Sequence, residues 1–182
     1  MEQKILYGTK VTLRPITMDD TYLIVKWRNN PTVKENFIFR EEFTPEIHQH
    51  WMKTKVASGD VVQYIIEDSK TSLPVGSVYF QHLDKKNNSA EYGIFIGEDS
   101  ARGKGLGTEA AQLFIQYGLN DLKLHRISLR VLAGNEAAYK SYLKVGFKHE
   151  GTFRDMVKLD GQYRDVIFMS ILESDNPKDM TE

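Results

Sequence analysis

A glycine-rich stretch between two ordered segments constrains this sequence more than any other feature. Residues 102–108 read Arg-Gly-Lys-Gly-Leu-Gly-Thr; they come after a strand-like run at 90–96 and open a helix-like run. Glycine tolerates unusual backbone angles and lets backbone N–H groups approach a phosphate closely. A helix start adds unpaired N–H groups and the positive end of the helix dipole. The stretch therefore predicts a pyrophosphate-binding turn, and a tight turn without a ligand is the alternative.

Two common phosphate-binding motifs do not fit the glycine spacing. A Walker A loop has four residues between its first glycine and the Gly-Lys pair, whereas Gly97 lies one residue too far from Gly103. Gly105 also stands where that loop has its Ser or Thr. A dinucleotide fingerprint requires G-x-G-x-x-G in a leading βαβ unit, and here the spacing is G-x-G-x-G deep in the chain.

Composition limits the classes of protein that this sequence can represent. The 182 residues predict one domain over residues 1–172 and a polar tail at 173–182. Because 24 basic residues balance 25 acidic ones, no nucleic-acid partner is expected. The absence of cysteine excludes disulfides and thiolate metal sites, and no HExxH motif or other metal site is seen. No apolar run has the length of a signal peptide or a membrane span, so we expect a cytoplasmic protein without a membrane partner.

The order of the expected elements indicates an α/β (α+β) fold with a mixed, mostly antiparallel sheet and helices on both faces. Three strands at 61–67, 74–83 and 90–96 are joined by short links, which is typical of an antiparallel meander. The other expected strands lie at 10–15, 124–131, 147–150 and 163–172. Helices are expected after Thr17, after Thr44, after the glycine turn, and from Asn135 to near Gly146. After the glycine turn, the apolar positions fall on one helix face and predict core packing: Leu106, Ala110, Leu113, Phe114 and Tyr117.

A second motif lies one strand after the glycine turn, and the two together resemble a known family. The GNAT superfamily of acyl-coenzyme A-dependent N-acetyltransferases has Arg/Gln-x-x-Gly-x-Gly/Ala in its first motif, which Arg102, Gly105 and Gly107 match. Its second motif is matched by Asn135, Ala138, Tyr142, Lys144, Gly146 and Phe147. The chain is most similar to the subgroup of Rim, spermidine and amino-sugar-nucleotide acetyltransferases. That likeness is carried by residues 11–15, 27–29 and 160–165.

The resemblance implies acetyl-CoA as cosubstrate, with its pyrophosphate held by the backbone of the glycine turn. The residues concerned are Arg102, Gly103, Lys104, Gly105, Leu106, Gly107 and Thr108. The charges of Arg102 and Lys104 would screen the pyrophosphate. Asn135 would bind the pantetheine arm or a nearby backbone group, and a plain helix cap is the alternative role.

The resemblance also implies direct attack of an amine on the thioester. A backbone N–H near Phe95 or Ile96 would bind the developing oxyanion. Tyr142 would protonate the leaving thiolate, because a tyrosine pKa of about 10 lies close to that of an alkyl thiol. A tyrosine packed at a helix end is the alternative interpretation of Tyr142.

Glu91, on the strand before the glycine turn, is the first candidate for the base that deprotonates the amine. Its alternatives are an exposed strand residue or a charge that orients the substrate. His82 and Asp84, at the end of the preceding strand, are the other candidates.

The resemblance places the amine acceptor between the first two helices, where Trp27, Arg28 and Asn29 are the predicted contacts. A polyamine enzyme should have a negatively charged cleft, and a nucleotide-sugar enzyme the reverse. The segment at 27–51 carries both signs and does not decide between them. The likeness of Trp27-Arg28-Asn29 to amino-sugar members leads us to expect a small-molecule amine, amino-sugar nucleotide first and polyamine next. Protein N-terminal acetylation is the runner-up, and a non-catalytic acyl-CoA sensor is the alternative of another class. Whether the chain forms a homodimer is left open.

Overall fold

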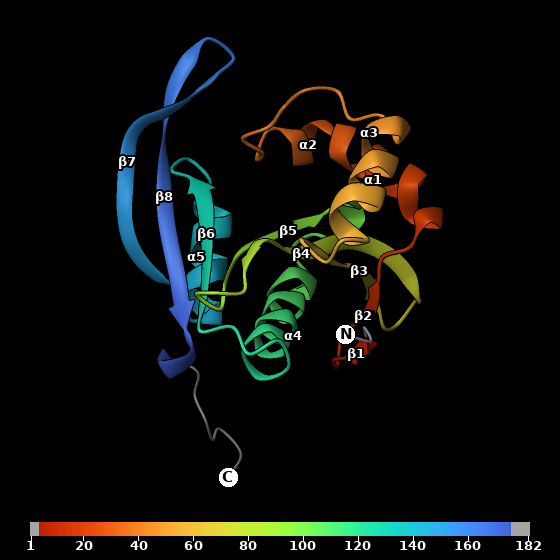
Figure 1. Ribbon diagram of the computed structural model, residues 1–182. Coiled ribbons are helices and arrows are strands. Elements are labelled where there is room, and N and C mark those ends of the chain that lie inside the picture. Colours follow the sequence, from red (N-terminus) through yellow and green to blue (C-terminus); the bar gives the residue numbers. More distant parts are fainter. Residues whose placement is uncertain (1–3, 176–182) are drawn as a thin grey trace.

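The computed structural model describes residues 4–175, in which eight strands form one twisted sheet (Figure 1). The strand order is β1-β2-β3-β4-β5-β6-β8-β7, and every neighbouring pair is antiparallel except β5 and β6. The expected mixed, mostly antiparallel sheet is therefore confirmed. The strands are β1 Leu6–Tyr7, β2 Val11–Pro15, β3 Val62–Asp68, β4 Leu73–Asp84, β5 Ser89–Ile96, β6 Arg126–Leu132, β7 Lys148–Leu159 and β8 Gln162–Leu172.

Helices cover both faces of the sheet, as the sequence predicts (Figure 1). One face carries α1 Thr21–Asn29, α2 Pro31–Lys34 and α3 Pro45–Trp51, with a π-helical turn at Met52–Val56. The opposite face carries α4 Leu106–Asn120 and α5 Glu136–Val145. Short 3₁₀ turns lie at Met18–Asp20, Asp99–Ala101 and Glu173–Asp175.

Local capping signals explain where these helices begin and end. The Thr44 side chain accepts a hydrogen bond from the Ile47 N–H, with Pro45 in the first turn of α3. Asn30 ends α1 and at the same time caps α2 by accepting from the Thr32 N–H. α5 ends at Gly146, whose φ of 110° is the left-handed conformation that favours glycine.

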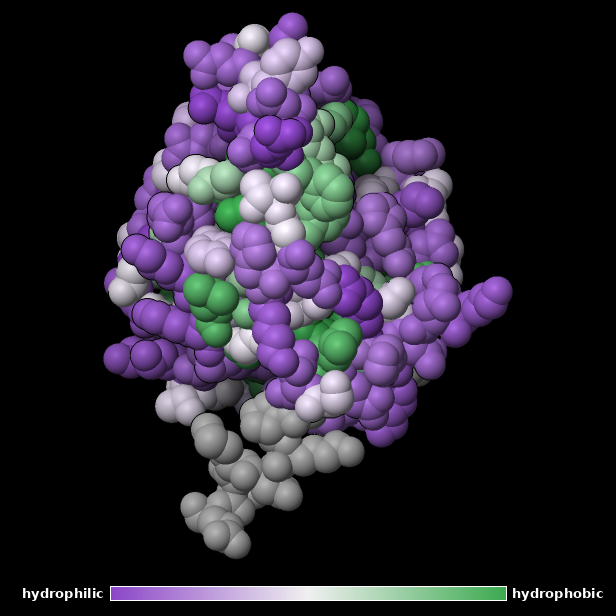
Figure 2. All heavy atoms as spheres, turned by 90° about the vertical axis from the view of Figure 1, so that its left-hand side faces the viewer, coloured by the Kyte–Doolittle hydropathy of each residue, from purple (hydrophilic) through white to green (hydrophobic). Residues whose placement is uncertain are grey.

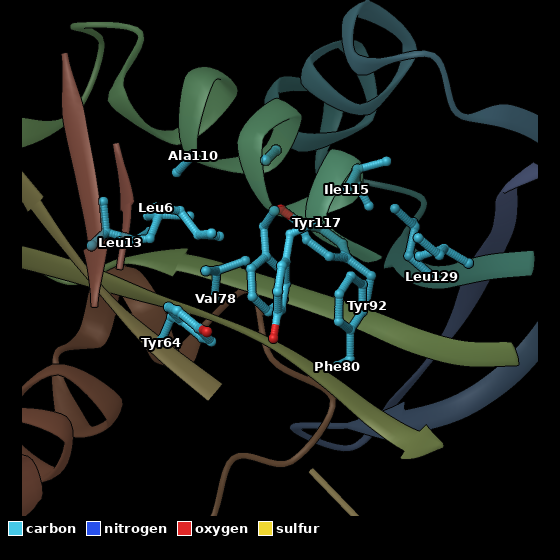
Figure 3. Packing of buried hydrophobic residues seen from close by; sticks show 14 of the residues in the cluster. Leu6, Leu13, Tyr64, Val78, Phe80, Tyr92, Ala110, Ile115, Tyr117 and Leu129 are labelled. Carbon is cyan, nitrogen blue, oxygen red and sulfur yellow. The ribbon is translucent and has the colours of Figure 1, made fainter. Parts of the chain in front are cut away.

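Alternating strand residues build one core on each side of the sheet. Tyr64 packs edge-on against Phe114 of α4, with ring centroids 5.3 Å apart, and Phe80 stacks on the same ring at 4.3 Å. Figure 3 shows Tyr64 and Phe80 of the sheet beside Ile115 and Tyr117 of α4. The residue after Tyr64, Ile65, points to the other face and packs with Trp27. The α4 stripe is core packing, as predicted, although Leu113 is only partly buried.

The two central parallel strands separate after three residue pairs. β5 and β6 pair at Ser89↔Arg126, Ala90↔Ile127 and Glu91↔Ser128, and no further pair follows. Beyond Glu91 the β6-facing edge of β5 therefore has no strand beside it. This separation creates the space in which the candidate site lies.

The late strand β7 is much longer than the predicted strand at 147–150. It pairs with β8 across two register shifts and is exposed along most of its length. Figure 2 looks onto this side of the molecule, where hydrophilic side chains predominate and hydrophobic ones lie between them. An exposed edge strand shows no clear apolar alternation, so the sequence pattern missed most of it.

The expected polar tail at 173–182 begins with an ordered turn. Asp175 pairs with Lys148 and accepts a hydrogen bond from the Leu172 N–H at 3.1 Å. The rest of that tail lies outside the described residues. Within residues 4–175, no helix is long and apolar enough to cross a membrane.

Candidate active site

A continuous cavity of about 1010 Å³ occupies the space between the separated strands. One half is lined by the glycine turn and α5, and the other half by α1, α3 and the link at 36–43. Ile38 of that link packs with Leu132, Leu159 and Val166, which join β6 and the β7–β8 hairpin. The link at 36–43 therefore reaches from α1 and α3 to the β7–β8 hairpin, and it bounds the cavity between them.

The glycine turn has the backbone conformation that its sequence predicts. Gly103 and Gly105 have φ of 74° and 81°, and Gly105 is the residue immediately before α4. These left-handed angles are strained for any residue with a side chain. A Cβ atom on Gly105 would also lie 3.3 Å from Nζ of Lys10, a nearby cation that the sequence analysis did not select. The turn thus presents backbone N–H groups and a helix start to the cavity.

Arg102 and Lys104 differ in what they contribute to the turn. Arg102 lines the cavity, but its Nε and Nη2 donate to the Ile96 carbonyl at 3.3 and 3.1 Å, and its Nη1 lies 3.1 Å from Asp99. It therefore fixes the shape of the turn as well as adding charge. Lys104 is exposed and is not among the lining residues.

Two lysines of α5 line the cavity and were not selected from the sequence as binding residues. Lys140 and Lys144 are four residues apart and so share a face of that helix. α5 is also tied to the turn, because the hydroxyls of Thr108 and Ser141 lie 3.2 Å apart. The spacing of Lys140 and Lys144 was the signal that could have revealed them.

The backbone of β5 alternates between β4 and the cavity. The Gly97 N–H donates to Val75 of β4, whereas the Ile96 carbonyl faces the other way and accepts from Arg102. Phe95 lies two residues before Gly97 and has the same phase, so its N–H also points to β4 and away from the opening. Of the two predicted oxyanion donors, the N–H of Ile96 therefore points to the cavity and the N–H of Phe95 does not. The N–H of Ile94, two residues before Ile96, points the same way as that of Ile96.

Asn135 and Tyr142 come to the cavity from the two ends of α5. The Asn135 side chain accepts a hydrogen bond from the Ala138 N–H at 3.1 Å, so it caps the helix and also lines the cavity. Tyr142 is partly buried and packs edge-on against Tyr92, with ring centroids 6.2 Å apart. Burial raises the pKa of the Tyr142 hydroxyl, which keeps it protonated at neutral pH.

The sequence matches the family described as Acetyltransferase (GNAT) domain over residues 10–148. The chain belongs to this family. It is 30% identical to the spermidine N(1)-acetyltransferase of Escherichia coli (strain K12) over 165 residues, which are 90% of this chain and 86% of the relative.

Solved structures share the fold over nearly the whole chain. The spermidine N-acetyltransferase of Vibrio cholerae in complex with CoA and spermine has a TM-score of 0.86 at 24% identity, over 92% of this chain and 98% of that one. A dodecameric structure of the V. cholerae enzyme has a TM-score of 0.81 at 25% identity, over 94% and 98%. Family and relatives together show an acetyl-CoA-dependent N-acetyltransferase, and the sensor alternative is set aside.

The residues of this GNAT domain suit CoA. The open glycine turn accommodates a pyrophosphate, and the unpaired edge of β5 offers N–H and C=O groups to an extended amide-bearing arm. The hydroxyl of Tyr92 is buried in the cavity wall without a hydrogen-bond partner among the described residues. A buried hydroxyl without a partner is costly, so this atom is available to a bound ligand.

Glu91 lies in the cavity wall where β5 and β6 separate, but its carboxylate already has partners. Its Oε1 accepts from Arg130 Nη2 at 2.9 Å and from Gln81 Nε2 at 3.1 Å. Its Oε2 lies 3.5 Å from Nδ1 of His82. Of the other base candidates, His82 and Asp84 do not line this cavity.

The predicted acceptor contacts Trp27, Arg28 and Asn29 separate in the structure. Trp27 is fully buried behind the cavity wall, where its Nε1 donates to Glu98 at 2.7 Å. The Asn29 side chain makes two hydrogen bonds with the backbone of Phe43: its Nδ2 donates to the Phe43 carbonyl at 2.7 Å, and its Oδ1 accepts from the Phe43 N–H at 2.9 Å. Trp27 and Asn29 therefore hold the first helix and the link in place, and only Arg28 lines the cavity.

His48 is a cavity residue that the sequence analysis did not propose for the acceptor site. The Thr21 hydroxyl donates to the Met18 carbonyl at 2.7 Å, so it accepts from Nδ1 of His48 at 3.1 Å. Nε2 is then the unprotonated nitrogen, and it is buried without a partner among the described residues. Burial lowers the pKa of His48, which favours this neutral form. No sequence signal separated His48 from the exposed His50.

No group of three or more His, Cys, Asp or Glu side chains in residues 4–175 is arranged to hold a metal ion.

Proposed function

We propose that this enzyme acetylates the primary amine of a small molecule by direct attack in a ternary complex. The observation that carries the proposal is the single cavity, which runs from the glycine turn to the space under α1 and α3. Both substrates then meet where β5 and β6 separate, so no acyl-enzyme is required. Holding both reactants in one enclosed site also removes much of the entropic cost of a bimolecular step.

Backbone groups of β5 position the thioester in this proposal. The N–H groups that face the opening, those of Ile94 and Ile96, lie on the unpaired edge of the strand. Acetyl-CoA supplies an activated acetyl group, and a fixed N–H beside the carbonyl stabilises the charge that develops on its oxygen. Ile96 is placed firmly because its own carbonyl is held by Arg102.

Tyr142 is the proposed general acid. It lines the cavity close to the start of α4, and its hydroxyl stays protonated because burial raises its pKa. A thiolate that leaves beside this hydroxyl takes its proton. Tyr139, three residues earlier on α5, is outside the cavity lining and lies 3.4 Å from His149.

Glu91 is the proposed base, acting through Oε2. Its Oε1 is held by Arg130 and Gln81, which fixes the carboxylate in the wall. The neutral Nε2 of His48 is a second acceptor for an amine proton in the same half of the cavity.

The charge of the cavity wall bears on the acceptor. The charged side chains that line it are Arg28, Glu91, Arg102, Arg130, Lys140 and Lys144. One carboxylate therefore faces five cations, and that carboxylate is paired with Arg130. Arg102, Lys140 and Lys144 belong to the half lined by the glycine turn and α5, where they face the phosphates of acetyl-CoA. In the acceptor half Arg28 has no ion-pair partner among the described residues, so although spermidine acetyltransferases are among the relatives, this half disfavours a polycation. We therefore place an amino-sugar type of acceptor before a polyamine.

The test measures thiol release from acetyl-CoA with spermidine, an amino-sugar nucleotide and short peptides as acceptors, using wild-type enzyme and Tyr142→Phe. Loss of a general acid should lower turnover about 10²–10⁴-fold. Affinity for CoA, measured by calorimetry, should change less than about threefold, because the glycine turn is untouched. Tyr139→Phe on the same helix is the matched control and should keep its turnover. Unchanged turnover in Tyr142→Phe removes Tyr142 as the acid.

Self-association as a homodimer, which the sequence left open, is tested by experiment. The edge strand β7 and the following hairpin expose Phe153, Met156 and Tyr163. Light scattering on the purified chain measures the mass directly.

A further inference from the structure

Arg28 is a partly buried cation that lines the acceptor half of the cavity, and its Nε atom is fully buried. It comes from the last turn of α1, and its Cζ lies 3.6 Å from the centroid of the Phe37 ring and 5.2 Å from that of Phe43. Both rings line the cavity with it. The two aromatic faces fix the plane of the guanidinium and favour its charge.

The guanidinium has almost no hydrogen-bond partners of its own. It carries five N–H donors, and the one contact within residues 4–175 is a long one, from Nη2 to the Phe39 carbonyl at 3.5 Å. Nε is buried without any partner in that range. A buried donor without a partner costs folding free energy, and donors of a charged group cost more. A buried polar group in a folded protein normally has a partner, and a water, an ion or a bound ligand can supply it.

No carboxylate neutralises Arg28 in the described structure. Two other cations of this part of the chain do have partners: Lys26 pairs with Glu98, and Arg40 pairs with Asp160. Burial lowers the pKa of Arg28 and the nearby Tyr79 hydroxyl raises it, but arginine remains charged at any physiological pH. Four acidic residues in the surrounding segment are exposed and do not line the cavity: Glu35, Glu41, Glu42 and Glu46.

We propose that Arg28 binds a carboxylate or phosphoryl group of the acceptor, so that the substrate is an amine that also carries an anion. A guanidinium offers parallel N–H donors that match both oxyanions in geometry. The proposal rests on acetyl transfer to an amine, and it adds the second recognition group. The acceptor's anion lies in the Phe37–Phe43 cage, and its amine extends toward Glu91 and the separation of β5 and β6.

The test compares matched amines that differ only in the anion. One pair is glycylglycine and its amide, the other is an amino-sugar phosphate and the free amino sugar, and spermidine is the polycation. Rates are measured for wild type, for Arg28→Met, and for the control Lys34→Met, a cation of the same segment outside the cavity lining. In wild type, one anionic member should exceed its neutral partner about ten- to a hundredfold in kcat/KM. The pair that shows the larger ratio of kcat/KM values tells whether Arg28 binds a carboxylate or a phosphoryl group.

Arg28→Met should reduce that preference to about one, with the KM for acetyl-CoA unchanged, while Lys34→Met keeps it. The Tm of Arg28→Met should equal or exceed that of wild type, because methionine removes a desolvated charge that has no partner. A lower Tm with the anion preference intact assigns Arg28 a structural role and overturns the proposal. Spermidine as the best substrate of both wild type and Arg28→Met also overturns it, while acetyl transfer stands.

Binding separates this proposal from the proposed reaction. If no amine releases thiol from a protein that binds acetyl-CoA, the proposed reaction fails. The anion site is then judged by calorimetry with N-acetylglycylglycine and an N-acetylamino-sugar phosphate in the presence of CoA. Binding of either by wild type and not by Arg28→Met supports the site. Binding of neither overturns it.

Discussion

Replacing Gly97 by alanine tests whether Trp27 belongs to the core or to the acceptor site. Gly97 follows β5, and the Trp27 indole lies directly over it. A Cβ atom added to Gly97 would stand 2.1, 2.3 and 2.4 Å from three indole carbons. The Gly97 backbone cannot withdraw easily, since its N–H donates to Val75 at 2.8 Å and its carbonyl accepts from Asn30 at 3.3 Å.

The cost follows from how firmly the indole is held. Ordinary carbon contacts are about 3.5 Å, so the Trp27 ring must move by about 1.4 Å. The ring is fully buried and its Nε1 bonds to Glu98, so it has no free direction. Overpacking costs about 1–3 kcal/mol, and weakening a hydrogen bond to a carboxylate adds to it. We expect a loss of about 3 kcal/mol and a fall in Tm of roughly 6–12 °C for a chain of this size.

Urea unfolding measures the change in the free energy of unfolding. The control is Gly151→Ala, because Gly151 has open space around its Cβ position and no positive φ. Trp27→Phe provides a double-mutant cycle, in which Gly97→Ala should cost at least about 1 kcal/mol less in the smaller-ring background. A loss no larger than that of Gly151→Ala, or strict additivity, refutes the packing of Trp27 on Gly97.

Two further perturbations test the glycine turn and an ion pair. Gly105→Asp should abolish CoA binding in calorimetry by placing bulk and negative charge in the turn. Gly59→Asp, at a similar φ of 79° in open space, should retain binding, and equal loss in both variants contradicts the turn's role. The Arg126 side chain lowers the pKa of Glu150 from 4.5 to about 2. The ion pair therefore stabilises the fold fully above about pH 4.5, and this stabilisation is lost as the pH falls toward 2. The difference in urea midpoint between wild type and Glu150→Gln should accordingly become smaller over that range. A gap that does not change with pH contradicts this linkage.

Features of the site that depend on a few adjacent residues were predictable from the sequence. The left-handed angles of Gly103 and Gly105 follow from a glycine turn, and the Asn135 cap with the Gly146 terminator follows from helix-end chemistry. The order of the longer strands and helices also followed, because each buried strand carries its own apolar pattern. The two-residue β1 and the one-turn α2 were not predicted.

Features that depend on pairing between distant segments were not predictable in this way. Whether the backbone N–H of Phe95 or that of Ile96 points to the cavity depends on the phase of β5 against β4, which the hydrogen bond from Gly97 to Val75 fixes. Trp27 and Arg28 are adjacent, yet one enters the core and the other the cavity. Their sequence gives the helix but not which of its faces meets the sheet.

The acceptor half of the cavity shows how one fold takes different amines. The glycine turn, the edge of β5 and Tyr142 are carried by the sheet and by the two helices that pack on it, and we propose that they bind the cosubstrate. The acceptor half depends on the first helices and the link at 36–43, where a charge faces either the cavity or the solvent. In this chain the acids of that segment are exposed and Arg28 is inside. Buried charge selects a substrate far more strongly than exposed charge, because water does not screen it. If Arg28 has its proposed role, this inward cation of the segment therefore outweighs the four outward acids in selecting the amine.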